Sequence, residues 1–256
     1  MSSIIWTRSG QKSNLRKLVQ DAWRVVEDQS QTATRKLVDS DQEQERLEEL
    51  IESVKPHIPA GPEWDHLHYL LFTPFRYPPL AHGSRFGRRS ERGLWYGSAK
   101  VETALAETAF WRLQFLNATA ADIRSELVLT AFCVSLSSRL AVDLTAAPLA
   151  AYESKMSSKT SYEWSQPLGG AMRADGVQFC RYVSARDPER GTNAAVFSPA
   201  AFVRKTVSDR SRENWHSYAT KTEIEFRRQG FAGSCRLRFA RQIFEVNGRL
   251  PVMESP

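Results

Sequence analysis

The chain has 256 residues, of which 41% are hydrophobic and 25% charged, a composition typical of a globular protein with one large domain or a core plus an extension. No apolar run approaches the roughly 20 residues of a membrane-spanning helix, and the first residues lack the apolar core of a secretory signal. We therefore expect a cytoplasmic protein that makes no membrane contact.

The net charge of +6 arises between Arg204 and Arg249, where 11 Lys and Arg face 5 Asp and Glu. A basic region of this kind binds nucleic acid in some proteins, binds an acidic protein partner in others, and most often is simply solvated. We do not expect direct nucleic-acid binding and keep it as an outside alternative.

Cysteine and histidine give no sign of a metal centre. Cys133, Cys180 and Cys235 are isolated from one another, and Cys133 and Cys180 lie in apolar runs where buried, unreactive thiols are expected. His66 and His68 would share one face of a strand, but no third ligand accompanies them. The sequence predicts neither a metal nor a disulfide.

The N-terminal segment, residues 1–66, is predicted to be a helical extension. An amphipathic helix is expected from about Asn14 to Asp28, and a second begins near Ser40, where Ser40 and Glu43 have the form of a capping box. Its apolar face consists of Leu47, Leu50, Ile51 and Val54, and Lys55 and Pro56 end it. The proline-rich stretch 55–64 follows as a linker.

Short apolar stretches then predict strands over 67–77, 94–98, 126–136, 176–184 and 194–198, with further candidates over 221–228 and 236–246. A helix is expected from about Val101 to Leu116. Few helices among many short strands favour an α+β fold, with a core over residues 67–205 and basic strands over 206–256 that complete or flank it. The chain has no Gly-rich dinucleotide or P-loop motif and no GxSxG elbow.

Residues 85–111 contain the most informative residue types. Glu107 lies on the predicted helix among alanines and apolar residues, where a solvent-facing carboxylate is the ordinary interpretation. However, Tyr96 lies on the strand before it, and four arginines precede that strand: Arg85, Arg88, Arg89 and Arg92. Arginines, an aromatic ring and one acid in a strand–helix unit suit an anionic ligand that carries rings, such as a nucleotide.

This segment resembles the first half of the RES domain, a family named for an Arg, a Glu and a Ser. The motifs are RFG from Arg85, WYG around Tyr96 and TALAE ending at Glu107, with eleven residues from Arg85 to Tyr96 and from Tyr96 to Glu107. Gly87 departs from the family, which more often has Asn there.

The second half of the family pattern is similar to residues 173–197. It places the family serine at Ser184, followed by Arg186, Asn193 and Phe197. Upstream, Arg76 and Tyr77 are similar to the first Arg–aromatic pair, so the likeness extends from about Leu67 to Pro199.

The resemblance implies a fold like that of the ADP-ribosyltransferase toxins and a reaction at the nicotinamide–ribose bond of NAD+, with NAD+ as substrate. Glu107 would stabilise the ribosyl cation, with Arg85 and Tyr96 as its catalytic partners. The NAD+ contacts implied are Arg76, Tyr77, Arg85, Tyr96, Ser184 and Asn193. Ser184 would orient a phosphate or Glu107, or make a structural hydrogen bond, and Arg186 is expected at the surface or in a salt bridge.

The function implied by the resemblance is a toxin that depletes NAD+, as a phosphorylase with inorganic phosphate or a glycohydrolase with water. A protein mono-ADP-ribosyltransferase, in which a protein side chain is the acceptor, is the alternative. The implied partner is a helix-turn-helix antitoxin of the Xre type. We expect it to contact the basic C-terminal region or the N-terminal helices.

Overall fold

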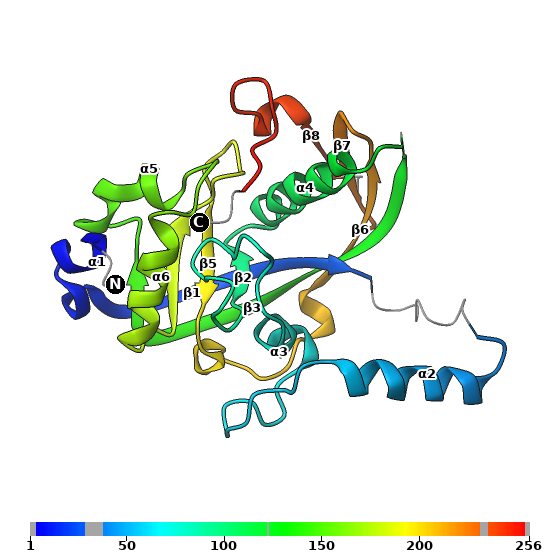
Figure 1. The fold of residues 1–256 in the computed structure, drawn as a ribbon, viewed down its shortest axis with the longest axis horizontal. Coiled ribbons are helices and arrows are strands. Elements are labelled where there is room, and N and C mark those ends of the chain that lie inside the picture. Colours follow the sequence, from blue (N-terminus) through cyan, green and yellow to red (C-terminus); the bar gives the residue numbers. More distant parts are fainter. Residues whose placement is uncertain (1–3, 29–37, 122, 231–234, 254–256) are drawn as a thin grey trace.

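The computed structural model describes residues 4–28, 38–121, 123–230 and 235–253 (Figure 1). The α-helices are α1 (Ile4–Arg8), α2 (Asp41–Val54), α3 (Tyr69–Arg76), α4 (Val101–Ala118), α5 (Glu153–Met156) and α6 (Ser165–Ala174). The strands are β1 (Leu15–Glu27), β2 (Trp95–Ser98), β3 (Ser125–Asp143), β4 (Phe179–Val183), β5 (Thr192–Val196), β6 (Arg212–Ala219), β7 (Glu223–Arg228) and β8 (Arg236–Ala240). The α+β class predicted from the sequence is confirmed.

The strands of the described residues form one eight-stranded sheet in the order β1-β2-β5-β4-β3-β6-β7-β8. Neighbouring strands are antiparallel except β3 and β4, which are parallel. Because β1 also pairs with β3, the pairings among β1, β2, β5, β4 and β3 close into a ring. Strands β6 to β8 continue the sheet from the first part of β3 and lie beside α4 in Figure 1.

The amphipathic helix predicted from Asn14 to Asp28 is wrong, because this segment is strand β1. Leu18, Gln20 and Ala22 are buried at every second position, while Val19 between them is 60% exposed. This alternation is that of a strand. β1 pairs with β3 over twelve residue pairs, and this ladder outweighs the helical spacing of its apolar residues. Helical structure therefore holds for only part of the segment 1–66.

The strand predicted over 67–77 is also wrong, because residues 69–76 form α3. Proline in a helix interior leaves the carbonyl four residues earlier without its usual donor. For Pro74 that carbonyl belongs to Leu70, and the indole of Trp95 donates to it over 3.3 Å. The apolar run that suggested a strand is the packed face of this short helix, with Leu70, Leu71 and Phe75 buried.

Helix α2 is confirmed where the capping box predicts it. The Ser40 side chain accepts from the backbone N–H of Glu43, and the helix ends at Val54 with Lys55 as its C-cap. No residue of α2 is buried, and the helix projects from the body of the molecule (Figure 1). The predicted helix over Val101 to Leu116 corresponds to α4, and the remaining predicted strands correspond to β2, β3, β4, β5, β7 and β8. β6 was not predicted.

Three apolar clusters pack against the strands of the sheet. Trp95 packs into one cluster with α3, while Tyr96, on the opposite face, borders a second cluster with α6. Helix α4 covers the third cluster together with β6, β7 and β8. Among the described residues, no helix combines the length and apolar character needed to cross a membrane.

Candidate active site

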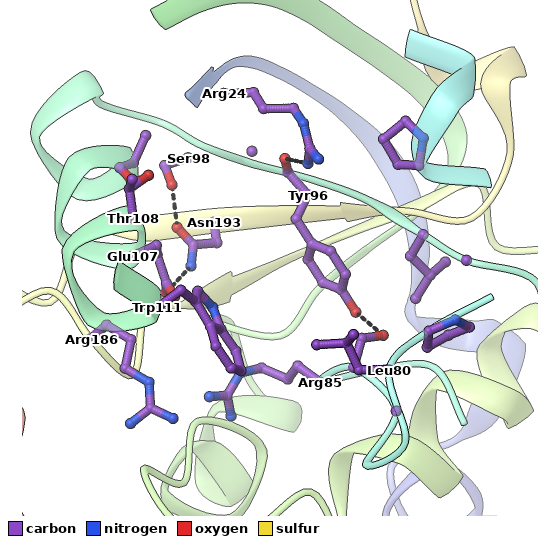
Figure 2. Close-up of a pocket in the computed structure, with 18 of the residues that line it drawn as sticks. Arg24, Leu80, Arg85, Tyr96, Ser98, Glu107, Thr108, Trp111, Arg186 and Asn193 are labelled. Atoms are coloured by element: carbon purple, nitrogen blue, oxygen red, sulfur yellow. Dashed lines mark hydrogen bonds between the residues drawn. The ribbon is translucent and has the colours of Figure 1, made fainter. Parts of the chain in front are cut away.

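A pocket with a volume of about 450 Å³ lies between β1, β2 and α4, and the loop over residues 77–85 walls one side (Figure 2). β1 contributes Trp23, Arg24 and Val25, and α4 contributes Glu107, Thr108 and Trp111. The predicted residues Tyr77, Arg85, Tyr96, Glu107 and Asn193 all line it. Residues that are far apart in the sequence therefore meet in one cavity.

The carboxylate of Glu107 is held through one of its two oxygens. Ser184 donates to Oε1 over 2.6 Å, and the amide of Asn193 donates to the same oxygen over 2.7 Å. No side chain of the described residues donates to Oε2. Glu107 is half-buried and lines the pocket. The bonded oxygen fixes the carboxylate, and the other oxygen remains available to a ligand.

Ser184 can only donate to Glu107, because its own lone pairs are occupied. Its Oγ accepts from the backbone N–H groups of Arg186 and Asp187 over 3.1 and 3.0 Å, so its single proton is left for the carboxylate. Asp187 in turn accepts from Thr103 at the start of α4 over 2.7 Å. These bonds fasten the loop after β4 to the helix that carries Glu107. Of the roles considered for Ser184 from the sequence, this geometry corresponds to the orientation of Glu107.

Asn193 is oriented by two neighbours. Ser98 on β2 donates to its carbonyl oxygen over 2.7 Å, which turns the NH2 group toward Glu107 (Figure 2). Tyr182 also hydrogen-bonds to Asn193, and burial raises the pKa of Tyr182 well above its ordinary value, so this phenol stays protonated. Asn193 therefore positions Glu107 from β5.

Arg85 and Tyr96 are joined through the loop that precedes β2. The Tyr96 hydroxyl donates to Ser84 over 2.9 Å and accepts from the backbone N–H of Phe86 over 3.1 Å. Burial raises the pKa of Tyr96, so the phenol is neutral at physiological pH. Arg85 is 7% exposed and donates to the carbonyls of Met156 and Ser158. The ring of Tyr96 walls the pocket, while its hydroxyl holds the Arg85 loop.

Arg24 is a pocket residue that the sequence interpretation missed. It donates to the carbonyl of Tyr96 over 2.9 Å, and its guanidinium lies 5.7 Å from the ring centroid of Trp95 (Figure 2). Burial lowers the pKa of Arg24 to about 10. It comes from β1, which was predicted as a helix, so nothing in its sequence surroundings pointed to the site.

The expectation for Arg186 is wrong, because this side chain is buried and forms no salt bridge with any residue that the structure describes. It is 3% exposed, lines the pocket, and its guanidinium lies 3.5 Å from the ring centroid of Phe110. Burial and the neighbouring Arg85 lower the pKa of Arg186 to about 10. The tight packing of the loop after Ser184 turns this side chain inward.

Arg76 does not belong to the pocket, so its predicted contact with NAD+ is not supported by its position. Its guanidinium pairs with Glu52 of α2 over 2.7 Å and donates to the carbonyl of Pro56. Tyr77, the next residue, is 39% exposed and lines the pocket rim. Arg76 therefore holds α2 against the rest of the molecule, while Tyr77 alone of this Arg–aromatic pair lines the pocket.

Aromatic side chains also line the pocket that contains Glu107. The His82 ring stacks on Trp111 with centroids 5.9 Å apart and an interplanar angle of 10°. Burial lowers the pKa of His82, so the ring is neutral at physiological pH. Tyr162 lies beside both Arg85 and His82. These rings give a flat ligand stacking surfaces next to the positive groups.

The basic C-terminal strands carry ion pairs within one strand and between neighbouring strands. Glu225 of β7 pairs with Arg227, Arg236 and Arg238, and Glu213 of β6 pairs with Arg228. The positive charge of this region is therefore interleaved with carboxylates. In the part of the chain that the structure describes, no group of three or more His, Cys, Asp or Glu side chains could hold a metal ion. Cys180 is buried, Cys133 is half-buried and Cys235 is exposed.

Fold and pocket together define an α+β enzyme domain centred on one oriented carboxylate. The chain belongs to the RES domain family, whose model matches residues 59–216. The matched segment includes Glu107, Ser184 and Asn193, so the resemblance inferred from the motifs is confirmed. RES domains are ADP-ribosyltransferase-like. A search of curated protein sequences found no match to the chain.

Proposed function

We propose that this protein cleaves the nicotinamide–ribose bond of NAD+ and transfers the ADP-ribosyl group to phosphate or water. The observation that carries the proposal is the Glu107 carboxylate, which Ser184 and Asn193 hold through Oε1 in a pocket lined by aromatic and arginine side chains. A fixed negative charge beside a cavity suits a reaction whose transition state is a cation.

In the proposed reaction the bond between C1 of the ribose and the nicotinamide nitrogen breaks. Its electron pair goes to the nitrogen, so nicotinamide leaves neutral and the ribose becomes an oxocarbenium-like cation. Glu107 stabilises this cation and accepts hydrogen bonds from the ribose hydroxyls through Oε2. An oxygen of phosphate then bonds to the carbon and gives a ribose 1-phosphate ester; with water, ADP-ribose and one proton are the products.

The other pocket residues would bind the dinucleotide. The ring of Tyr96 would wall in the nicotinamide, and Tyr77 would cover it at the rim. Both rings line the cavity, and aromatic walls of this kind keep bulk water from a reactive cation. Arg85 and Arg24, which line the same cavity, would supply positive charge to the phosphates of the substrate.

The test is NAD+ turnover by the purified chain and by Glu107→Gln, with and without phosphate. The carbonyl of the introduced amide can still accept from Ser184 and Asn193, so the fold is kept while the charge is lost. We expect turnover to fall by about 10²–10³-fold, the usual effect of removing one transition-state stabiliser. Glu102→Gln, an exposed position on the same helix, is the matched control and should leave turnover unchanged. NAD+ loss that persists in Glu107→Gln would refute the assignment.

We further propose that the protein acts as the toxin of a toxin–antitoxin pair, restrained by a helix-turn-helix protein of the Xre type. Family membership and the destructive nature of the proposed reaction support this role, since an enzyme that empties the NAD+ pool needs an inhibitor. Expression of the wild-type chain should arrest growth, and expression of Glu107→Gln should not. Growth arrest by both variants would contradict it.

A further inference from the structure

Two arginines in the pocket are buried, and the Glu107 carboxylate acts on the charge of Arg186 without forming an ion pair with it. Arg85 and Arg186 are 7% and 3% exposed, and no carboxylate of the described residues forms an ion pair with either. Their guanidinium groups lie on the same side of Glu107 and Trp111 in Figure 2. A buried positive charge is costly unless it is paired, and two together cost more.

Arg186 also has an unused donor. Its Nη1 is buried and has no hydrogen-bond partner among the described residues. Nη2 has a long contact, 3.8 Å, with the sulfur of Met253, which is a weak acceptor. One face of the guanidinium rests on Phe110. A charged group held on an apolar ring with a free N–H points to a ligand acceptor that completes its bonding.

Tyr162 places the two guanidinium groups around a common space. Arg85 lies 5.2 Å from the centroid of the Tyr162 ring, and Arg186 hydrogen-bonds to the same side chain. Arg85 uses Nη1 for the carbonyls of Met156 and Ser158, which fixes its plane. The two arginines are therefore positioned around Tyr162, and neither forms an ion pair with a carboxylate of the described residues.

We infer that Arg85 and Arg186 form a binding site for a phosphate group. A guanidinium presents two parallel N–H donors to an oxyanion, and two such groups match a tetrahedral dianion better than they match a single carboxylate. The role of this phosphate site in a reaction rests on the proposed cleavage of NAD+. The phosphate comes either from the diphosphate of the substrate or from free inorganic phosphate as the acceptor.

The experiment measures binding, so its outcome does not depend on turnover. Inorganic phosphate and ADP-ribose are titrated separately into the purified full chain by calorimetry, at constant ionic strength in chloride. The variants are Arg186→Gln, Arg186→Lys, and Arg92→Gln as the matched control. Arg92 is exposed, stacks over Trp64 and lies outside the pocket, so its loss changes the net charge equally.

We expect Arg186→Gln to weaken binding of at least one of the two ligands by about tenfold or more, as for other charge-assisted hydrogen bonds. The affinity of Arg186→Lys, which keeps the positive charge but loses the paired N–H donors of the guanidinium, should lie between those of Arg186→Gln and the wild type. The affinity of Arg92→Gln should equal that of the wild type. Binding of inorganic phosphate alone identifies the acceptor site; binding of ADP-ribose alone identifies the diphosphate site.

Affinities in Arg186→Gln within twofold of the wild type for both ligands would overturn the inference, as would failure of both ligands to bind the wild type. Circular dichroism and the unfolding temperature establish that Arg186→Gln is folded. If it is not, Arg186→Lys decides, because it keeps the buried charge. Failure of the proposed function is distinct: it is the absence of NAD+ turnover, or turnover that survives Glu107→Gln.

Discussion

Replacing Ser184 with alanine tests whether the orientation of Glu107 matters for catalysis. Ser184 touches the carboxylate through a single hydrogen bond of 2.6 Å and does not line the pocket itself. It is therefore a positioning residue, and its removal should lower kcat while KM for NAD+ changes little. A hydrogen bond to a charged group contributes about 1.5–3 kcal/mol, which corresponds to about 10- to 150-fold in rate.

The expected loss lies at the lower end of this range. Asn193 still donates to the same oxygen over 2.7 Å in Ser184→Ala, so the carboxylate keeps one of its two fixed contacts. We therefore expect kcat to fall by about 10- to 30-fold. Removing both donors, in Ser184→Ala with Asn193→Ala, should cost more than either alone. The assay is the initial rate of NAD+ loss over a range of NAD+ concentrations.

Ser138 offers a matched control for the structural cost of this change. Its hydroxyl donates to Gln178 over 2.7 Å and accepts from the backbone N–H of Leu140 over 2.8 Å, a similar arrangement away from the pocket. Ser138→Ala should lower the unfolding temperature comparably and leave kcat unchanged. If Ser184→Ala keeps the wild-type kcat, or if Ser138→Ala loses activity to the same degree, the reasoning about Glu107 is wrong.

Three further results are expected. Gly169→Ala should lower the unfolding temperature markedly, because a Cβ there would lie 1.9 Å from the carbonyl oxygen of Phe86; an unchanged midpoint would contradict the close packing of α6. Burial lowers the pKa of His82, so the unfolded chain binds a proton at this histidine more readily, and the free energy of unfolding should fall as pH drops below the ordinary histidine pKa. His82→Phe should therefore lose less stability than the wild type on acidification, as measured by denaturant unfolding. Equal losses in the two proteins would refute the argument. Arg76→Gln should leave KM for NAD+ unchanged but speed proteolysis of α2, because it removes the ion pair between Arg76 and Glu52. A raised KM would instead indicate that Arg76 contacts the substrate.

Local signals were sufficient to predict α2, α4 and the position of Glu107. The capping pair Ser40 and Glu43 is a short-range interaction, and the helix formers between Val101 and Ala118 act within one element. Motifs with fixed spacing brought Tyr96 and Glu107 into one strand–helix unit. Information of this kind survives in a single sequence because its physical cause is local.

The failures have long-range causes. β1 is extended because β3, more than 100 residues later, supplies its hydrogen-bond partners, and α3 is a helix although Pro74 interrupts its bonding, because Trp95 replaces the missing donor. The inward turn of Arg186 depends on the bonds that the Ser184 hydroxyl makes to the loop. In each case the conformation depends on a tertiary contact that the local sequence pattern does not indicate.

The position of β1 sets a lower limit on the size of a working unit. The family match begins at residue 59, but β1 ends at Glu27 and supplies Trp23 and Arg24 to the cavity. A fragment cut at the start of the match would leave an edge of β3 unpaired and the cavity open on one side. Any minimal catalytic fragment must therefore begin before Leu15, so boundaries taken from family similarity alone would give a protein that misfolds or is inactive.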